Sequence, residues 1–315
     1  MTRWVLALAG LLAAGPVRAE TLKVAVPQKG NWDTSIVEFG IRQGFFKAQG
    51  LDIDVIYTQG GAPTMQAVIS GSVDIGMATG LLGVVGAYAK GAPVRVISAE
   101  MTGAPDLFWY AKSQSGITAL ADAKGKTAGY SEPGSSTDLT LRALIDQAHA
   151  DVKPVATGGI PGTLTQVMSG QIDIGWSVPP ASLQAVQDGT LRIVARGDDV
   201  PAIRGETIRV NFANASALQS KHDAIEKFAR VYVKSLAWAY GDPKSIGYFA
   251  EGMNVTEPIA QQARDQFYPQ QAMEPFEVRG QELMLQQALD YKFIPHPMTP
   301  SDIAGLFTIM GKDAQ

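Results

Sequence analysis

Residues 60–76 read GGAPTMQAVISGSVDIG, and residues 158–175 read GGIPGTLTQVMSGQIDIG. The two stretches match in order and in spacing except for a single inserted residue in the second. An internal match of this length is not expected by chance. Because stacked repeat arrays need at least three copies, two copies predict a pair of similar units and not a solenoid.

Each copy has the pattern of a loop, a short helix and a buried strand. The Gly-Gly pair predicts a loop, and the proline that follows, Pro63 or Pro161, is typical of the first turn of a helix. The glycine after serine, Gly71 or Gly170, predicts the helix end, and the apolar residues around Asp-Ile-Gly predict a short strand. We therefore expect two similar α/β lobes that face each other.

Short apolar segments alternate with helical ones in the rest of the chain. Before Gly103 the pattern predicts strands at 22–26, 53–57 and 94–98 and helices at 36–48 and 81–90. After it, elements are expected at 107–111, 126–130, 137–148 and near residues 152, 172 and 191. This alternation predicts parallel sheets covered by helices.

Beyond residue 204 the pattern becomes mostly helical. The segment 207–212 is expected to return as a strand to the first lobe. Ser220 is expected to cap a long helix, and Thr299 to open the last one. These helices have the spacing of packing elements, so we expect no chemistry there.

The first nineteen residues have the features of an export signal. Arg3 is followed by an apolar run from Trp4 to Ala14, and small residues precede a cleavage point near Ala19. This run is much shorter than the ~20 residues that span a bilayer, so a cleaved signal is expected in place of an anchor. The mature chain would begin at Glu20.

Composition excludes several classes of function. The chain has no cysteine, so disulfides, thiolate catalysis, cysteine-ligated metals and a lipid-modified cysteine are all excluded. The net charge is −4 and no basic cluster occurs, which argues against nucleic acid as a partner. Stability must therefore come from a buried core.

Several short motifs, in this order, resemble the periplasmic binding proteins of the aliphatic sulfonate, taurine and nitrate group, which also includes thiamine-pyrimidine-synthase-like proteins. They are GFFKAQGLD at 44–52, GSVD at 71–74, LADAKGKTAGY at 120–130, GSS at 134–136, GQID at 170–173 and KSLAW at 234–238. The resemblance extends over about residues 21–308.

The resemblance implies a type II periplasmic-binding-protein fold. Each of its two lobes would be a mainly parallel α/β sheet flanked by helices, with the ligand in the cleft between them. After a signal peptide at 1–19, residues 20–104 would begin lobe 1, 105–205 would form lobe 2, and 206–315 would complete lobe 1. The chain would cross between the lobes near 103–105 and 204–206.

The resemblance also implies partners and a location. We expect a monomeric, periplasmic protein of the Gram-negative type that binds a small molecule and delivers it to an ABC permease and its ATPase. No cofactor or metal is expected. The chain has no Gly-x-x-x-x-Gly-Lys-[Ser/Thr] motif, so ATP hydrolysis would belong to a partner.

Ligand sites of open α/β sheets lie beyond the carboxyl ends of the strands. Four loops qualify, at 29–32, 60–62, 78–80 and 133–137. In the last of these, hydroxyl groups and unpaired N–H groups at a helix start could bind an acidic or carbonyl oxygen, although one hydroxyl could simply cap the helix. The residues expected to bind ligand are Gly30, Asn31, Trp32, Gly60, Gly61, Ala62, Thr79, Gly80, Thr102, Ser135, Ser136, Thr137, Trp176 and Ser177.

Other candidates have a structural explanation that is at least as good. Trp32 and Trp176 could equally belong to the core, since aromatic residues supply much of any core. Asp74 and Asp173, in equivalent repeat positions, are expected to bond nearby backbone, and Arg209 to be exposed or ion-paired.

One departure from the resembled family bears on the ligand. Where members often carry Trp, an acid and Pro, this chain has Ser177-Val178-Pro179-Pro180. The missing acid puts recognition of a substrate amine in doubt and leaves a sulfonate, a carboxylate or a neutral heterocycle open.

Two alternative functions stay open. A periplasmic sensor that signals to a membrane kinase would share all of these features. A thiamine-pyrimidine-synthase-like enzyme would need the cysteine-rich motif that is absent here. His149, His222 and His296 stand apart without metal-ligand spacing or a neighbouring nucleophile, so we expect no enzymatic activity.

Overall fold

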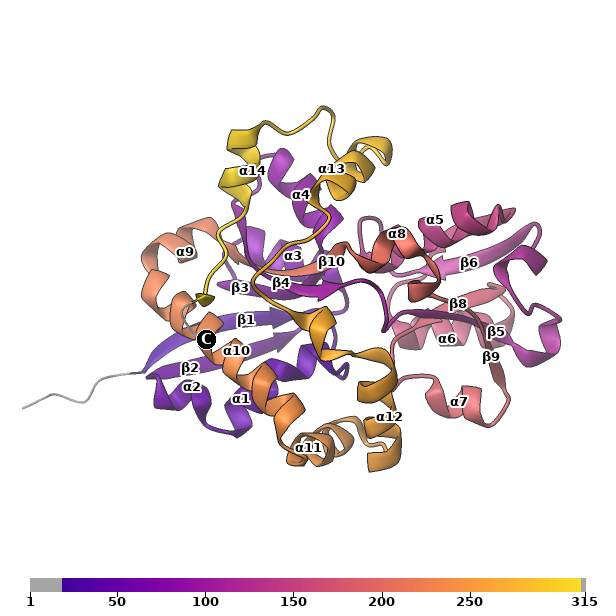
Figure 1. The fold of residues 1–315 in the computed structure, drawn as a ribbon, viewed down its shortest axis with the longest axis horizontal. Helices are drawn as coiled ribbons and strands as arrows, with labels where there is room; N and C mark the ends of the chain where they lie inside the picture. The colour runs from indigo at the N-terminus through magenta and orange to yellow at the C-terminus, as the bar shows by residue number, and fades with distance from the viewer. Residues whose placement is uncertain (1–18, 313–315) are drawn as a thin grey trace, which may run out of the picture.

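The computed structural model describes residues 19–312, in which the strands form two separate five-stranded sheets side by side (Figure 1). The order in sheet A is β2–β1–β3–β10–β4, formed by β1 (Glu20–Val26), β2 (Leu51–Tyr57), β3 (Ile75–Gly80), β4 (Val94–Thr102) and β10 (Thr207–Asn214). The order in sheet B is β7–β6–β8–β5–β9, formed by β5 (Phe108–Lys112), β6 (Lys126–Tyr130), β7 (Val152–Ala156), β8 (Ile174–Ser177) and β9 (Leu191–Arg196).

Both sheets have the same topology. In each, one strand runs antiparallel to its two neighbours: β10 in sheet A and β5 in sheet B. The remaining pairs are parallel. These antiparallel strands are the first ones that the chain forms after it passes from one sheet to the other. The mainly parallel, two-lobed α/β architecture expected from the sequence is therefore confirmed.

Helices flank both sheets (Figure 1). Those around sheet A are α1 (Ile36–Arg42), α2 (Phe45–Ala48), α3 (Gly61–Ile69), α4 (Leu81–Ala89), α9 (Ala215–Ser220), α10 (His222–Gly241), α11 (Lys244–Met253), α12 (Glu257–Phe267), α13 (Gln281–Asp290) and α14 (Pro300–Leu306). Those around sheet B are α5 (Ser136–Ala148), α6 (Ile160–Ser169), α7 (Leu183–Gln187) and α8 (Pro201–Arg204). We call each sheet with its helices the A lobe or the B lobe. The end of α12 reaches the B lobe, where Phe267 packs on Phe108.

The sequence repeat corresponds to equivalent structures. Its copies form α3–β3 in the A lobe and α6–β8 in the B lobe, and both β3 and β8 occupy the third position of their sheets. Asp74 accepts a hydrogen bond from the N–H of Lys23 at 2.9 Å, and Asp173 does so from Thr127 at 2.9 Å. Each aspartate thus fixes its repeat to the neighbouring parallel strand, β1 in sheet A and β6 in sheet B, which is second in the strand order of its sheet.

Local predictions about helix boundaries had mixed outcomes. The helix expected over 36–48 is split into α1 and α2 because Gly44 adopts the left-handed conformation, with φ of 69°. The expected Ser220 cap was wrong: this residue ends α9, and its hydroxyl donates to the carbonyl of Ser216. The cap at Thr299 is confirmed, since its hydroxyl accepts from the N–H of Asp302.

Two chain crossings, at residues 103–107 and 197–206, join the lobes and lie against each other. The N–H of Gly103 donates to the carbonyl of Glu206 at 2.8 Å, and the N–H of Gly197 donates to that of Leu107 at 2.8 Å. We propose that these crossings mark the domain limits, with residues 105–205 as the B lobe. Paired crossings of this kind allow rigid lobes to move about a shared axis.

A buried acid at the second crossing gives a pH-dependent prediction. Burial raises the pKa of Glu206 to about 7, and the Nε2 of Gln287 donates a hydrogen bond to its carboxylate at 3.2 Å. Since the folded-state pKa is raised, the wild-type chain loses stability as the pH rises from about 4.5 through 7. We expect Glu206→Gln to stabilise the protein by up to about 3 kcal/mol at pH 8.5 and by little at pH 4.5. Urea unfolding of both proteins at the two pH values checks this; an equal effect at both would contradict it.

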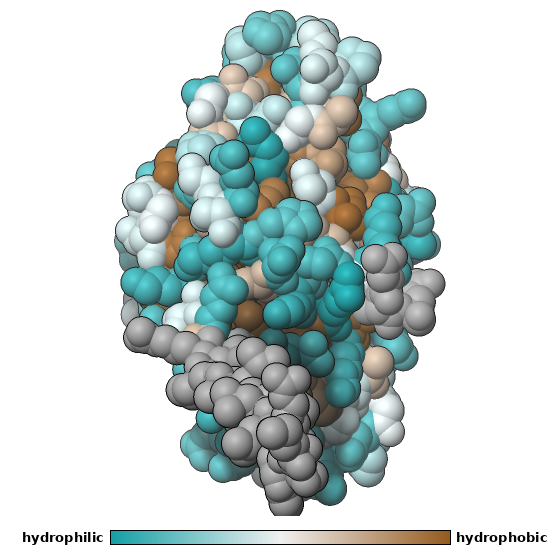
Figure 2. All heavy atoms as spheres, turned by 90° about the vertical axis from the view of Figure 1, so that its left-hand side faces the viewer, coloured by the Kyte–Doolittle hydropathy of each residue, from teal (hydrophilic) through white to brown (hydrophobic). Residues whose placement is uncertain are grey.

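Most large apolar side chains of the described residues are buried, and few lie on the surface. The large hydrophobic side chains exposed on the described residues are Ile56, Met168 and Leu283. On the outer face of the A lobe, hydrophilic residues predominate and hydrophobic ones are scattered (Figure 2). None of the helices between residues 19 and 312 combines the length and hydrophobicity that crossing a membrane would require.

Candidate functional site

A pocket of about 70 Å³ lies between the two lobes. Its walls are loops at the carboxyl ends of β1, β2, β3, β6, β7 and β8, together with the first crossing and β10, as expected for a ligand site in open α/β sheets. The lining residues are Pro27, Gln28, Asn31, Asp33, Thr34, Gln59, Gly60, Gly61, Ala78, Gly80, Leu107, Ser131, Glu132, Ser135, Ser136, Thr137, Gly159, Trp176, Val178 and Arg209.

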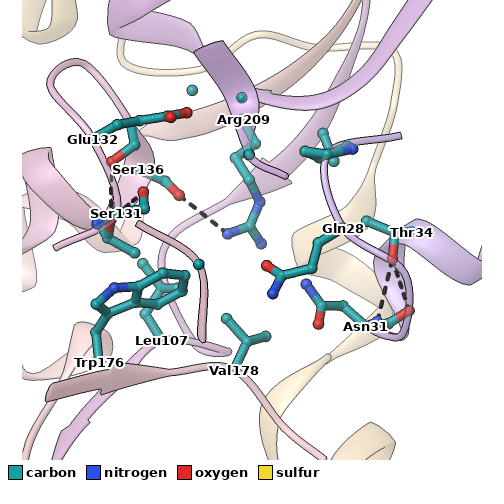
Figure 3. A pocket seen from close by; sticks show the side chains of 18 of the residues that line it. Gln28, Asn31, Thr34, Leu107, Ser131, Glu132, Ser136, Trp176, Val178 and Arg209 are labelled. Atoms are coloured by element: carbon teal, nitrogen blue, oxygen red, sulfur yellow. Dashed lines mark hydrogen bonds between the residues drawn. The ribbon is translucent and has the colours of Figure 1, made fainter. Parts of the chain in front are cut away.

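On the A-lobe side, side-chain amides face the pocket. Gln28 and Asn31 point toward Arg209 from the loop after β1 (Figure 3). The carbonyl of Asn31 accepts from the hydroxyls of Thr34 and Ser35, at 3.1 and 2.7 Å, which fixes the conformation of this loop. Ala78 has a φ of 45°, a strained conformation for alanine, and its N–H donates to the buried Asn211 side chain.

On the B-lobe side, hydroxyl groups at the start of α5 have different roles. Ser135 caps the helix, since its hydroxyl accepts from the N–H of Asp138 at 3.1 Å. Thr137 accepts from the N–H of Ser131 at 2.8 Å and so orders the loop. Ser136 is different, because its hydroxyl lies 3.4 Å from Nη1 of Arg209 (Figure 3). Of these three hydroxyls, that of Ser136 is the one bonded to the charged group in the pocket and not to the helix start or its loop.

An apolar wall closes one side of the pocket. It consists of Trp176, Leu107 and Val178 (Figure 3). Trp176 is buried, and its Nε1 donates to Thr157 at 3.2 Å, which holds the ring in place. A fixed indole ring of this kind can pack against the apolar or aromatic part of a ligand.

Arg209, on β10, forms the charged centre of the site. Its Nε donates to Glu100 at 3.0 Å, and its Nη2 donates to Asp106 at 2.7 Å and lies 3.6 Å from Asp33. All four side chains are buried. Of the two alternatives expected from the sequence, an exposed or an ion-paired arginine, the structure shows the second: Arg209 is buried, and three carboxylates surround its guanidinium.

Burial controls the ionisation of this cluster. Burial raises the pKa of Glu100 well above its ordinary value, and the negative charge of Asp33 raises it further. The positive charge of Arg209 acts in the opposite direction and lowers this pKa. Burial also raises the pKa of Asp106, to about 6. Each of Asp33, Glu100 and Asp106 has one oxygen with no hydrogen-bond partner among residues 19–312.

Glu132 joins the two lobes directly. Its side chain comes from the B lobe, and its carboxylate accepts from the N–H of Ala62 at the start of α3 in the A lobe. The N–H of Gly83 donates to the carbonyl of Gly134 across the same boundary, at 3.1 Å. Burial raises the pKa of Glu132, while the backbone N–H bonds oppose this. The lobes are therefore in contact around the pocket.

The structure brings many of the predicted residues together. Those that line the pocket are Asn31, Gly60, Gly61, Gly80, Ser135, Ser136, Thr137 and Trp176.

The remaining predicted residues lie outside the lining. Gly30 packs on Met253, and Trp32 is buried edge-to-face against Phe39, Tyr240 and Phe249. The N–H of Ala62 is bonded to Glu132. The other three residues use their hydroxyls in hydrogen bonds within the protein: Thr79 donates to the carbonyl of Met77, Thr102 pairs with Thr207, and Ser177 donates to the carbonyl of Ala181.

Sequence reasoning missed the acids of the site. Asp33 directly follows the predicted loop 29–32, and Glu132 directly precedes the predicted loop 133–137, so the same strand-end argument could have found both. Asp106 and Glu100 gave no such signal, because their role depends on Arg209, more than a hundred residues away in the chain.

The lining combines polar and charged groups with an apolar face. No histidine is among the lining residues, and Ser136 is next to a guanidinium and not a general base. Within residues 19–312 no group of three or more His, Asp or Glu side chains is arranged to hold a metal ion. The site instead presents hydroxyls, amides, an indole face and charged groups around a small volume.

Solved structures share this fold. The aliphatic sulphonate binding protein SsuA of Escherichia coli has a TM-score of 0.71 at 20% identity, covering 90% of this chain and 91% of that one. SsuA of Xanthomonas axonopodis pv. citri, bound to MOPS, has a TM-score of 0.76 at 16% identity, covering 94% and 100%. The nitrate-binding protein NrtA of Synechocystis PCC 6803 has a TM-score of 0.71 at 12% identity, covering 93% and 86%.

Sequence comparison also places the chain. Proteins of Brucella abortus and Brucella suis, named only as candidate binding proteins, are 28% identical over 183 residues, which is 54% of this chain and 52% of theirs. The chain thus spans about half the length of the curated relatives that it matches. The sequence model of the NMT1/THI5-like family matches residues 34–246, well over half of the chain. The chain therefore belongs to the NMT1/THI5-like family.

Proposed function

We propose that this protein is the substrate-binding component of an ABC-type importer. It would bind a small organic solute between its lobes and deliver it to a membrane permease that is driven by an ATPase. The observation that carries the proposal is the pocket itself, which is lined from both lobes and bounded by hydrogen bonds that require the lobes to meet. A ligand that contacts both lobes stabilises this closed arrangement.

The comparisons support this proposal. The solved structures with this fold are named as binding proteins for sulfonates and nitrate, and the Brucella relatives as candidate binding proteins. A periplasmic location would follow from export. The expected signal peptide at residues 1–19 lies almost wholly outside the described residues, so it stays a prediction. The pocket's lack of a paired nucleophile and base favours binding over catalysis.

A thermal-shift screen tests the proposal. Sulfonates, aromatic carboxylates, pyrimidines, amides and amines would each be added to the purified protein. A compound that binds only the folded state at a hundred times its Kd adds about 2.7 kcal/mol to the free energy of unfolding. At least one compound should therefore raise the melting temperature and bind with 1:1 stoichiometry in calorimetry. If none does so, the proposed function is wrong.

Neighbouring serines allow ligand contact to be separated from helix capping. With the best compound from the screen, Ser136→Ala is expected to lower the affinity about tenfold, the loss of one hydrogen bond of roughly 1.4 kcal/mol. Its melting temperature without ligand should stay close to that of the wild type.

The matched variant is Ser135→Ala, which removes the cap and should lower stability by about 1 kcal/mol. Calorimetry and thermal unfolding of both variants make the comparison. Binding by Ser136→Ala within twofold of wild type would show that this hydroxyl does not contact the ligand.

A further inference from the structure

The charged groups around the pocket limit the class of ligand. We propose, on the basis of the binding function above, that the pocket selects a small neutral or cationic ligand with an N–H donor directed at Asp33, and that it rejects simple organic anions. Amides, amidines, amines and nitrogen heterocycles belong to the selected class. Carboxylates and sulfonates belong to the rejected one.

Asp33 is the group that would receive the donor. It begins the short 3-10 helix Asp33–Ser35, lines the pocket and is only 3% exposed. Its Oδ2 lies 3.6 Å from Nη2 of Arg209, whereas its Oδ1 is buried with no hydrogen-bond partner in the described part of the chain. A buried carboxylate that lacks a full set of donors is unfavourable, so a ligand N–H group that reaches the Asp33 carboxylate from the pocket lowers that cost.

Arg209 does not make the pocket attractive to anions. Among the described lining residues it is the sole cation, and its charge is already shared by Glu100, Asp106 and Asp33. An anionic ligand beside this group would add to an excess of buried carboxylates, whose repulsion water screens poorly. A neutral acceptor fits better, because within residues 19–312 the hydrogen bond of Arg209 Nη1 is a single long one, to Ser136 at 3.4 Å.

A helix start on the A-lobe side that could bind an anion is occupied by the protein. The start of α3, with its Gly60-Gly61-Ala62 backbone, is the kind of helix terminus that binds anions. In this structure the carboxylate of Glu132 accepts the N–H of Ala62 at that terminus. An acidic ligand group could bind this helix start only by displacing the Glu132 carboxylate, whose negative charge would still be nearby. The carboxylate of Glu132 therefore takes the place that a ligand anion would need.

Matched probes that differ mainly in charge test this inference. One series is acetate, acetamide and acetamidinium, and the other is benzoate, benzamide and benzamidinium. Thermal shift and calorimetry at pH 7.5 measure binding of each. In at least one series we expect the amide or the amidinium to bind at least tenfold more tightly than the carboxylate.

Variants then link the preference to Asp33. Asp33→Asn should weaken binding of the preferred probe at least tenfold and narrow the gap between that probe and the carboxylate. Asp173→Asn, which alters a carboxylate outside the pocket, should leave the affinity unchanged. Unfolding of each variant without ligand shows whether it is folded. If Asp33→Asn does not fold, Glu132→Gln provides a second variant, which should also weaken the preference for the amide or amidinium over the carboxylate.

The outcomes separate this inference from the proposed function. If a carboxylate or sulfonate binds as well as its neutral or cationic counterpart, the inference is wrong and the binding function stands. If no member of either series binds but a compound of the wider screen does, the inference is also overturned. If nothing binds at all, both fail.

Discussion

Replacing Arg209 with methionine is expected to lower the free energy of unfolding by about 3–5 kcal/mol, because it leaves three buried carboxylates without their common cation. Glu100 and Asp106 each have a direct hydrogen bond to this guanidinium, and neither is exposed to water. Urea unfolding at pH 8 measures the loss. At pH 5 it should be smaller, because the raised pKa values of Glu100 and Asp106 allow these groups to be protonated.

The control for this variant is Arg279→Met. Arg279 pairs with Glu277 at 2.8 Å, but both side chains are exposed, so its loss should cost less than about 1 kcal/mol. A triple variant, Arg209→Met with Glu100→Gln and Asp106→Asn, should recover part of the stability because it removes the uncompensated charge. A loss for Arg209→Met no larger than that for Arg279→Met would contradict the role of this cluster.

Gly80→Val is expected to abolish ligand binding, with a loss of affinity greater than about a hundredfold, or roughly 2.7 kcal/mol. A Cβ atom at Gly80 would lie 2.6 Å from the carbonyl oxygen of Gly134 and 2.9 Å from Cα of Ser135. Both are backbone atoms of the other lobe. Since neither can move aside alone, the lobes would have to separate, and the ligand would lose its contacts with one of them.

Small-angle X-ray scattering provides the second readout for Gly80→Val. The variant should keep a larger radius of gyration than the wild type, with or without ligand. Its folding should be little affected, because Gly80 has an ordinary backbone conformation, with φ of −55°. Gly241→Val, where an added Cβ meets nothing within 4 Å, is the matched control and should bind normally. Tight binding by Gly80→Val would show that closure is not required.

The sequence predicted the parts of the fold that depend on local pattern. The repeat at 60–76 and 158–175 revealed two equivalent lobes, because the same loop, helix and strand must pack in the same way twice. The segment 207–212 was correctly expected to be a strand, and the structure places it in sheet A between β3 and β4. The break at Gly44 was missed, since glycine inside a helical pattern is tolerated as often as it ends a helix.

The candidate site was predictable by position but not by side-chain direction. All four predicted strand-end loops contribute residues to the pocket, yet Trp32 turns into the core while its neighbours Asn31 and Asp33 line the pocket. Sequence spacing cannot show which way a loop residue points. The charges around the pocket could not be predicted from the sequence either, because Arg209 contacts Glu100 and Asp106 only after the two crossings bring distant segments together.

The most direct test of this account is a crystal structure of the protein with the compound that raises its melting temperature most. We expect one molecule of that compound between the lobes, in contact with Ser136 of the B lobe, with Asp33 of the A lobe and with the ring of Trp176. Electron density for the compound at any other place, with the pocket between the lobes occupied by water alone, would contradict the central claim that this pocket is the binding site.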